Sequence, residues 1–213
     1  MTVLLFDIDN TLLDFDKAEY MALGKIFEQY HIEDTKENRA IYSRENKALW
    51  RSHEAGEISR EELLSTRFAN AFRALGVNAA YQLHLAQGHE LMDHAMELLD
   101  CLAQEATEMY IVSNGTSKVS RPRILESGIA GYFKEIFISE EIGKHKPSKE
   151  FFDYVFEHID HAADKDFAIV GDTLATDILG GKNAGIKTIW YNPKHLEAQK
   201  DLTPDCVIED LLE

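Results

Sequence analysis

The chain has 213 residues, with 38 acidic against 22 basic side chains and a formal net charge of −16 at pH 7. Hydrophobic residues make up 45% of it, which is enough for a packed core and excludes a disordered chain. The excess of acidic side chains argues against nucleic acid or an anionic membrane as the main partner. It leaves open a small phosphorylated substrate, because local cations outweigh charges that lie beyond a Debye length.

The cysteines and the lengths of the apolar runs indicate in which cellular compartment the protein is expected. Cys101 and Cys206 lack the spacing of a metal motif, and two thiols do not make a disulfide framework. The first apolar run is broken by Asp7 and Asp9 before it reaches the length of a signal or membrane segment. We therefore expect a cytoplasmic protein without membrane or nucleic-acid partners, either a monomer or a weak dimer.

The chain begins with a strand and continues with helices. Residues 2–8 are predicted to form a strand buried on both faces, because the run from Val3 to Phe6 is apolar without polar alternation. Apolar residues then recur at three- and four-residue steps. Asp34 with Glu37 and Ser59 with Glu62 resemble capping boxes. This pattern predicts helices at about 16–30, 34–53, 59–76, the last stopped by Gly76, and 79–89.

From Leu91 the pattern alternates between helix and strand. We expect strands at 109–112, 136–138, 167–170, 186–190 and 206–208, separated by helices that include 148–159 and 176–184. Such alternation predicts right-handed crossovers and a parallel sheet covered by helices. The fold class is therefore α/β, with a catalytic core of residues 1–14 and 89–213 and an all-helical insertion at 15–88.

Polar residues follow several of the predicted strands, at the edge where an open parallel sheet binds its ligands. Together they offer a carboxylate nucleophile, a second carboxylate for proton transfer, oxygen ligands for magnesium, a hydroxyl and an ammonium. These groups are what phosphoryl transfer requires. They are Asp7 and Asp9, which begin on one face of the first strand, Ser113 and Asn114, Lys146, and Asp172.

Each group also has an ordinary interpretation. An aspartate after a strand is commonly a helix cap or turn former, and Ser113 to Gly115 can be a plain turn. Lys146 alone can be a solvated surface residue, and Asp177 can serve a helix N-terminus. These residue types occur in this order at four strand ends or loops, which is improbable by chance. We therefore prefer the interpretation that they form one functional site.

The ordered set resembles the haloacid dehalogenase superfamily of aspartate-nucleophile phosphatases over the whole chain. DxDxT stands at Asp7 to Thr11, the second motif at Ser113 to Gly115, the third at Lys146–Pro147, and GDxxxxD at Gly171 to Asp177. The resemblance implies a Rossmann-like core, and the helical insertion matches the position of the C1-type cap in this superfamily.

The resemblance also implies roles. Asp7 attacks phosphorus and forms an aspartyl-phosphate, while Asp9 protonates the leaving oxygen and then activates water. Mg²⁺ is held by Asp7, the Asp9 backbone carbonyl and Asp172. Phosphate oxygens are bound by Ser113 and the Asn114 amide and neutralised by Lys146. Asp177 orients Lys146 or a metal-bound water, and the Thr11 hydroxyl braces the turn after the first motif.

The cap is expected to choose the substrate. Trp50 and Arg67 flank a loop with Gly56, and they are candidates for contacts to a nucleobase, or else for packing and ion pairing within the cap. Segments such as 46–50 and 138–143 resemble the bacterial noncanonical pyrimidine 5′-nucleotidases. This similarity implies hydrolysis of pyrimidine (deoxy)nucleoside monophosphates. Pro122 departs from the relatives by falling inside a helix, and His145 receives no role.

Several other functions compete with this one. The substrate can be another small phosphorylated metabolite, such as a sugar phosphate or phosphoglycolate, and a phosphomutase uses similar chemistry. A phospho-receiver signalling module also phosphorylates an aspartate, but Asp9 and the inserted cap argue against it. A carbon–halogen hydrolase needs neither magnesium nor an acid for its leaving group, so Asp9 and Asp172 disfavour it.

Overall fold

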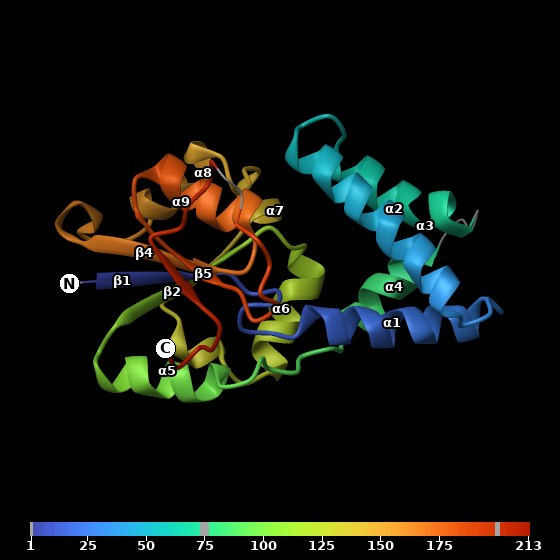
Figure 1. Ribbon diagram of the computed structural model, residues 1–213, viewed down its shortest axis with the longest axis horizontal. Coiled ribbons are helices and arrows are strands. Elements are labelled where there is room, and N and C mark those ends of the chain that lie inside the picture. Colours follow the sequence, from blue (N-terminus) through green and yellow to red (C-terminus); the bar gives the residue numbers. More distant parts are fainter. Residues whose placement is uncertain (1, 73–76, 199–200) are drawn as a thin grey trace. The chain divides into compact units, whose positions relative to one another are not determined.

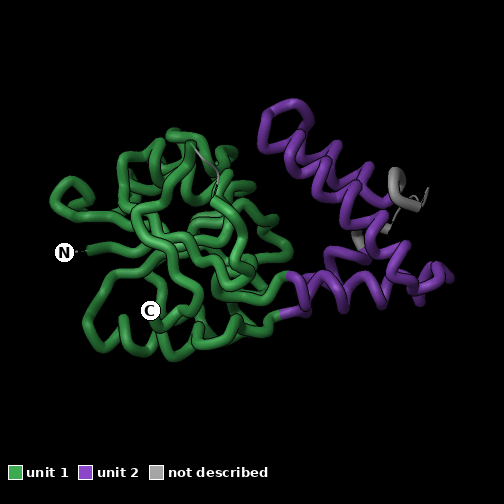
Figure 2. The backbone as a smooth tube through the Cα atoms, viewed as in Figure 1, with its two compact units in different colours: residues 1–15, 89–213 green, residues 16–88 purple. Residues whose placement is uncertain are grey.

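The computed structural model describes residues 2–72, 77–198 and 201–213, and the chain forms two compact units (Figure 2). Unit 1 comprises residues 1–15 and 89–213, and unit 2 comprises residues 16–88. On the unit 1 side of the two crossings, the outgoing and returning segments pair. The Asp14 N–H donates to the Glu90 carbonyl, and the Met92 N–H donates to the Leu12 carbonyl, both at 2.9 Å.

Unit 1 contains one six-stranded sheet in the order β3-β2-β1-β4-β5-β6, and every pairing in it is parallel (Figure 1). The prediction of a parallel α/β core is thereby confirmed. β1 lies in the middle, so the residues that follow it are flanked by the ends of β2 and β4. The strands are β1 (Thr2–Phe6), β2 (Glu108–Ser113), β3 (Glu135–Ile138), β4 (Asp166–Gly171), β5 (Lys187–Tyr191) and β6 (Cys206–Ile208).

Helices cover both faces of this sheet (Figure 1). The side chains of β1 alternate between the two cores, because successive strand residues point to opposite faces. Leu4 and Phe6 pack with α5 and α6, whereas Val3 and Leu5 pack with α8. The helices of unit 1 are α5 (Ala95–Gln104), α6 (Ser117–Glu126), α7 (Ser139–Ile142), α8 (Lys149–Glu157) and α9 (Leu179–Ala184).

The described residues of unit 2 form helices joined by turns and loops, with no strand among them. It packs around three aromatic rings, since Tyr42 stacks on Phe68 at 4.8 Å and Tyr81 lies edge-on to Phe68 at 5.0 Å between ring centroids. The helix α1 begins at Phe15, one residue before the boundary of the unit. The helices are α1 (Phe15–Gln29), α2 (Lys36–Glu54), α3 (Arg60–Phe72) and α4 (Val77–Leu85).

Helix starts in unit 2 show where local signals succeed and fail. The Ser59 hydroxyl accepts from the Glu62 N–H at 3.1 Å, as its capping signal predicts. The start of α2 was predicted wrongly by one residue, because the N-cap is Thr35, which accepts from Asn38. Asp34 instead binds the Arg39 guanidinium at 2.6 Å. The predicted stop at position 76 lies outside the described residues.

Helix bounds in unit 1 differ in similar ways. The predicted helix 176–184 is a π-helical turn, Leu174–Ile178, followed by α9. The helix α6 begins at Ser117 and keeps Pro122 in its interior. The short α7 was not predicted, since four residues are too few to show a helical period. None of the described helices is long and apolar enough to cross a membrane.

Candidate active site

Asp7 lies at the centre of the sheet edge where β1, β2 and β4 end. Its backbone N–H continues the sheet by donating to the Val170 carbonyl at 2.9 Å, and its side chain is buried, with 8% of the residue exposed. Oδ1 accepts a hydrogen bond from Lys146 Nζ at 2.7 Å, and Oδ2 accepts one from the Thr11 hydroxyl at 3.4 Å. The carboxylate is therefore held by an ammonium and a hydroxyl.

Lys146 is buried and places all three of its ammonium protons on protein oxygens. Nζ donates to Asp7 Oδ1, Asp177 Oδ1 and the Val112 carbonyl, each at 2.7 Å. Burial alone would lower the pKa of Lys146, but the attraction of Asp177 and Asp7 outweighs it and raises the pKa. The structure places the Lys146 ammonium between Asp7, the predicted nucleophile, and Asp177, and its predicted role on phosphate oxygens stays a prediction.

Asn114 and Ser113 shape the loop after β2. The Asn114 side chain clamps the Lys146 backbone in both directions, with Nδ2 donating to its carbonyl and Oδ1 accepting from its N–H, both at 2.9 Å. Ser113 Oγ accepts from the Gly115 N–H at 3.0 Å. A Cβ at Gly115 would lie 2.2 Å from Ser120 Oγ, so a larger residue there would require the Ser120 side chain to move. The Asn114 side chain thus ties the loop after β2 to the segment that carries Lys146.

A tight turn carries the chain away from Asp7. The Ile8 carbonyl accepts from the N–H groups of Leu12 and Leu13 at 3.0 and 2.9 Å, and Asn10 takes a positive φ of 62°. Asparagine tolerates this conformation better than most residues. The turn directs the Thr11 hydroxyl back to Asp7, so Thr11 braces the predicted nucleophile itself.

The loop after β4 supplies two more carboxylates. The Asp172 carbonyl accepts from Trp190 Nε1 at 2.8 Å, which ties this loop to β5. Asp177 accepts from the Thr173 N–H at 3.1 Å in addition to Lys146. A Cβ on Gly171 would lie 2.4 Å from the Asp177 carboxylate, so the absence of a side chain there lets Asp177 reach its partners.

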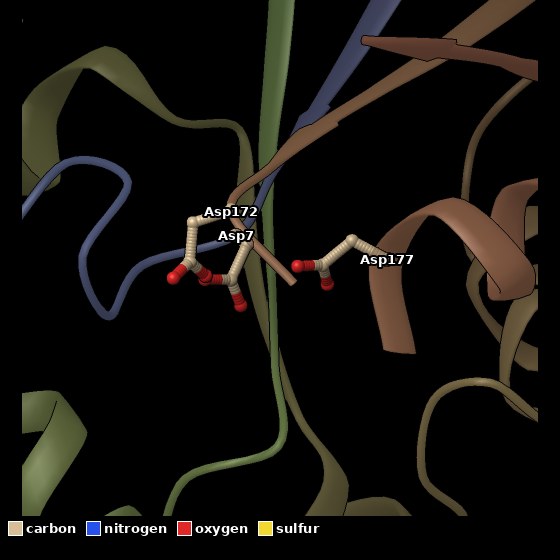
Figure 3. A group of neighbouring side chains, drawn as sticks. All are labelled: Asp7, Asp172 and Asp177. Atoms are coloured by element: carbon tan, nitrogen blue, oxygen red, sulfur yellow. The ribbon is translucent and has the colours of Figure 1, made fainter. Parts of the chain in front are cut away.

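Carboxylate oxygens of Asp7, Asp172 and Asp177 lie within 4.8 Å of one another (Figure 3). Burial, only partly offset by Lys146, raises the pKa of Asp7 well above its ordinary value, and the charges of Asp177 and Asp172 raise it further. Burial also raises the pKa of Asp172 to about 7, and the charge of Asp177 adds to this rise. The site therefore holds more negative charge than its own cations balance.

A comparison of the sequence with models of protein families matches residues 4–191 to the haloacid dehalogenase-like hydrolases. The chain belongs to this family. Among its relatives are the HAD-hydrolase YfnB of Bacillus subtilis, 40% identical over 99% of this chain and 92% of the relative, and the pyrimidine 5′-nucleotidase PynA of Streptococcus pneumoniae, 36% identical over 99% and 96%. The pyrimidine 5′-nucleotidase YjjG of Escherichia coli is 33% identical over 99% and 94%.

The fold of this hydrolase agrees with the family. A crystal structure of YfnB bound to magnesium matches it with a TM-score of 0.93 at 39% identity, covering 99% of this chain and 95% of that one. The six-stranded parallel core with surrounding helices is therefore the Rossmann-like core of the haloacid dehalogenase fold.

The residues of the site fit a divalent cation. Asp7 and Asp172 offer carboxylate oxygens, which are the ligands that Mg²⁺ prefers. Four carboxylates, including Asp9, face two cations, so two formal negative charges lack compensation. Both Asp177 oxygens already accept protein hydrogen bonds, which leaves Asp177 less suited to the metal than Asp172.

Arg123 is a residue of this site that the sequence reasoning missed. It lies on α6 and is fully buried, and its Nη1 donates to Asp9 Oδ1. The buried face of α6 comprises Val119, Ser120, Arg123 and Ile124. An arginine on an otherwise weakly polar helical stripe, one residue after the unusual proline, was the signal available in the sequence.

The predicted cap residues Trp50 and Gly56 lie in the last part of α2 and in the turn that follows it. Trp50 is partly exposed at the end of α2, edge-on to His53 at 6.0 Å and under the Arg60 guanidinium at 5.9 Å. Gly56 is exposed, with a φ of 76°, in the turn that leads to α3. Both residues are accessible on unit 2.

Arg67 lies inside unit 2, with only 3% of the residue exposed. Its guanidinium sits 4.7 Å from the centroid of the Tyr81 ring. The Tyr81 hydroxyl and Asn46 Nδ2 both donate to Glu19 Oε1, at 3.2 and 3.3 Å. This environment favours the interpretation of Arg67 as a packing and charge-balancing residue of the helical unit over direct contact with a base.

Proposed function

We propose that this hydrolase is a Mg²⁺-dependent 5′-nucleotidase that acts on pyrimidine (deoxy)nucleoside monophosphates through an aspartyl-phosphate on Asp7. The observation that carries the chemistry is the buried Asp7 carboxylate, held by Lys146 and Thr11, with Asp9 two residues away. The substrate class is supported by the two pyrimidine 5′-nucleotidases, 36% and 33% identical over nearly the whole chain.

In the first half-reaction, an Asp7 oxygen forms a bond to phosphorus while the bond from phosphorus to the ester oxygen breaks. Protonated Asp9 gives its proton to the departing oxygen, which leaves as the nucleoside hydroxyl. Lys146, which contacts Asp7 Oδ1, orients the carboxylate for attack. The Ser113 hydroxyl and the Asn114 amide bind the phosphoryl oxygens in this proposal.

In the second half-reaction, the Asp9 carboxylate takes a proton from water as the water oxygen bonds to phosphorus. The bond between Asp7 and phosphorus breaks, which frees inorganic phosphate and restores both aspartates. Asp7, the Asp9 carbonyl and Asp172 would hold Mg²⁺, which when bound would supply positive charge for the transferring group. Trp50 and Gly56 are the cap residues proposed to contact the base.

The proposal extends to the setting of the reaction. Both cysteines are free and exposed, which suits the reducing cytoplasm that we propose for this enzyme. A small phosphorylated metabolite is the partner, and a monomer or a weak dimer is the proposed state.

A phosphate-release screen with Mg²⁺ tests the function. It compares pyrimidine monophosphates, purine monophosphates, sugar phosphates and phosphoglycolate. We expect kcat/KM for uridine 5′-monophosphate to exceed the other classes by about tenfold or more, a difference that one set of contacts to a base edge can supply. Higher kcat/KM for a sugar phosphate would overturn the substrate assignment, and formation of phosphosugar isomers would indicate a mutase.

Asp7→Asn tests the chemistry separately from the substrate. Loss of the nucleophile should lower kcat by about 10⁴-fold or more and abolish acid-stable labelling of the protein by phosphate. Asp153→Asn is the matched control, because Asp153 is an exposed aspartate that pairs with Lys149 on the surface of α8. Full activity of Asp7→Asn would contradict the mechanism.

A further inference from the structure

Arg123 is an arginine with no measurable exposure that contacts the carboxylate proposed for proton transfer. Its Nη1 donates to Asp9 Oδ1, across 114 positions of sequence. Burying a guanidinium costs free energy unless the group is paired, so the buried Arg123 depends on its ion pair with Asp9. Among the residues that the structure describes, Arg123 is the side chain that donates to the Asp9 carboxylate.

The same guanidinium also lies over the ring of Phe15, with 5.3 Å between Cζ and the ring centroid. Phe15 is the last residue of unit 1 before the chain enters the helical insertion. Arg123 therefore contacts both ends of the segment 9–15, one end through an ion pair and the other through a cation–π contact. The contact with the Phe15 ring helps to fix the guanidinium, and the ion pair with the fixed guanidinium restricts the rotation of the Asp9 side chain.

The helix α6 explains how Arg123 reaches this position. Ser120 and Arg123 lie one turn apart on its buried face, and α6 starts from the loop that carries Ser113 and Asn114. The neighbouring Arg121 points the other way, with 47% of its side chain exposed, and pairs with Glu141 at 2.6 Å. One short helix thus carries two ion-paired arginines, one in the site and one on the surface.

We propose that Arg123 is a positioning residue for phosphoryl transfer, which holds Oδ1 of Asp9 so that Oδ2 exchanges the proton with the leaving oxygen and then with water. This inference rests on the proposed function. The guanidinium touches neither phosphorus nor the leaving group in this scheme, and it acts through Asp9. A planar fork with fixed geometry suits this task better than an ammonium on a flexible stem.

The two half-reactions depend on Asp9 in different ways, and the dependence can be measured. A nucleoside leaves as an alcohol and needs the proton of Asp9, whereas p-nitrophenolate departs as a stable anion without it. Hydrolysis of the aspartyl-phosphate needs Asp9 as a base for either substrate. A residue that only positions Asp9 must therefore affect the first half-reaction of a nucleotide but not that of p-nitrophenyl phosphate.

Arg123→Met, which keeps the length of the side chain and removes the charge, is the test variant. Rapid-quench measurements follow aspartyl-phosphate formation from uridine 5′-monophosphate and from p-nitrophenyl phosphate. We expect a loss of about 10- to 100-fold for the nucleotide, because small misplacement of a catalytic group has costs of this size. Aspartyl-phosphate formation from p-nitrophenyl phosphate should stay within about threefold of wild type, since the acid is not needed.

Arg121→Met is the matched control. It removes an ion-paired arginine from the same helix but lies outside the site, so both rates should remain at the wild-type value. Hydrolysis of the aspartyl-phosphate should slow in Arg123→Met and not in Arg121→Met. Arg123→Lys should recover part of the lost rate, because it restores the charge without the fork.

Two results with a folded Arg123→Met would overturn the inference. The first is wild-type kinetics, and the second is an equal loss of the rate of aspartyl-phosphate formation for both substrates, which would indicate a general structural role. If Arg123→Met does not fold, the comparison is made with Arg123→Lys, and a third contradicting result is the absence of a rate loss that is selective for the nucleotide. Failure of the wild type to form any aspartyl-phosphate would instead contradict the proposed function.

Discussion

Both units of this hydrolase bury ionic side chains, but the balance of charge differs between them. In unit 2, the partly buried Glu19 lies near the buried Arg67, so one acid is matched by one cation. In unit 1, Asp7, Asp9, Asp172 and Asp177 face only Lys146 and Arg123. Buried charge by itself thus says little about chemistry.

The difference lies in where the charges converge. Asp7, Asp9 and Asp172 follow the ends of parallel strands, and Asp177 lies in the helical turn after β4. This placement brings carboxylate oxygens of Asp7, Asp172 and Asp177 within 4.8 Å of one another. The raised pKa values of Asp7 and Asp172 report the cost of this placement. A divalent cation bound by Asp7 and Asp172, as proposed above, would offset part of this negative charge, and functional sites are commonly less stable than the rest of the protein.

Removing the cation of the core should give the largest effect. Lys146→Met leaves Asp7 and Asp177 buried without their shared partner, so we expect unit 1 to lose about 3–5 kcal/mol of unfolding free energy. Turnover should fall by about 10³-fold, since Asp7 loses its orientation and the site loses positive charge. Chemical denaturation and phosphate release measure the two losses, and retention of activity would contradict the importance of the core charge balance.

A change that adds only a methyl group should also damage the core. The Cβ of Gly171→Ala would lie 2.4 Å from the Asp177 carboxylate, which must then move away from Lys146. We expect a loss of about 1–3 kcal/mol of stability from overpacking. Turnover should fall by more than the small fraction of unfolded protein accounts for, because the displaced Asp177 no longer holds Lys146. Gly131→Ala is the control, because open space surrounds that position, and it should leave turnover unchanged.

The excess acid of the core should make stability depend on pH. The folded pKa of Asp172, about 7, is above its unfolded value, so its contribution to stability is present below about pH 4 and is lost as pH rises through about 7. Each pH unit in this window changes stability by at most about 1.4 kcal/mol. Melting curves without metal should show this decline in the wild type and a smaller one in Asp172→Asn.

Mg²⁺ should reverse that trend, because it binds the deprotonated carboxylates. Its stabilisation of the protein should be larger at pH 8 than at pH 6, with the apparent affinity rising up to about tenfold per pH unit below pH 7. Asp172→Asn should remove most of this gain. A pH-independent effect of Mg²⁺ in the wild type would place its binding elsewhere.

The smallest effect is expected in unit 2. Burial raises the pKa of Glu19, against the hydrogen bond from Tyr81, so the folded state favours the protonated acid, which Glu19→Gln imitates. At pH 7 this variant should change stability by less than about 1 kcal/mol, toward a gain, and should leave turnover of p-nitrophenyl phosphate at the wild-type value. A large loss of activity would show that the polar cluster of unit 2 does more than balance charge.

The sequence by itself determined the sheet and the residues at its carboxyl edge. Short apolar runs such as Val3 to Phe6 are typical of buried strands, and helical crossovers between them favour a parallel sheet. The carboxyl ends of parallel strands lie at one edge of the sheet, so the backbone topology alone predicts that Asp7, Ser113 and Asp172 lie near one another. The family motifs named the same positions.

Only the tertiary structure decided how the side chains pair. Lys146 donates its hydrogen bonds to Asp7, Asp177 and a backbone carbonyl, and Arg123 donates to Asp9. Both arrangements follow from packing between elements more than 30 positions apart in the sequence. Local propensity carries no information over such distances, and even the cap at Thr35 depends on a partner, since Arg39 occupies Asp34. The sequence therefore specifies which groups meet at the sheet edge, and packing specifies which of them hold one another.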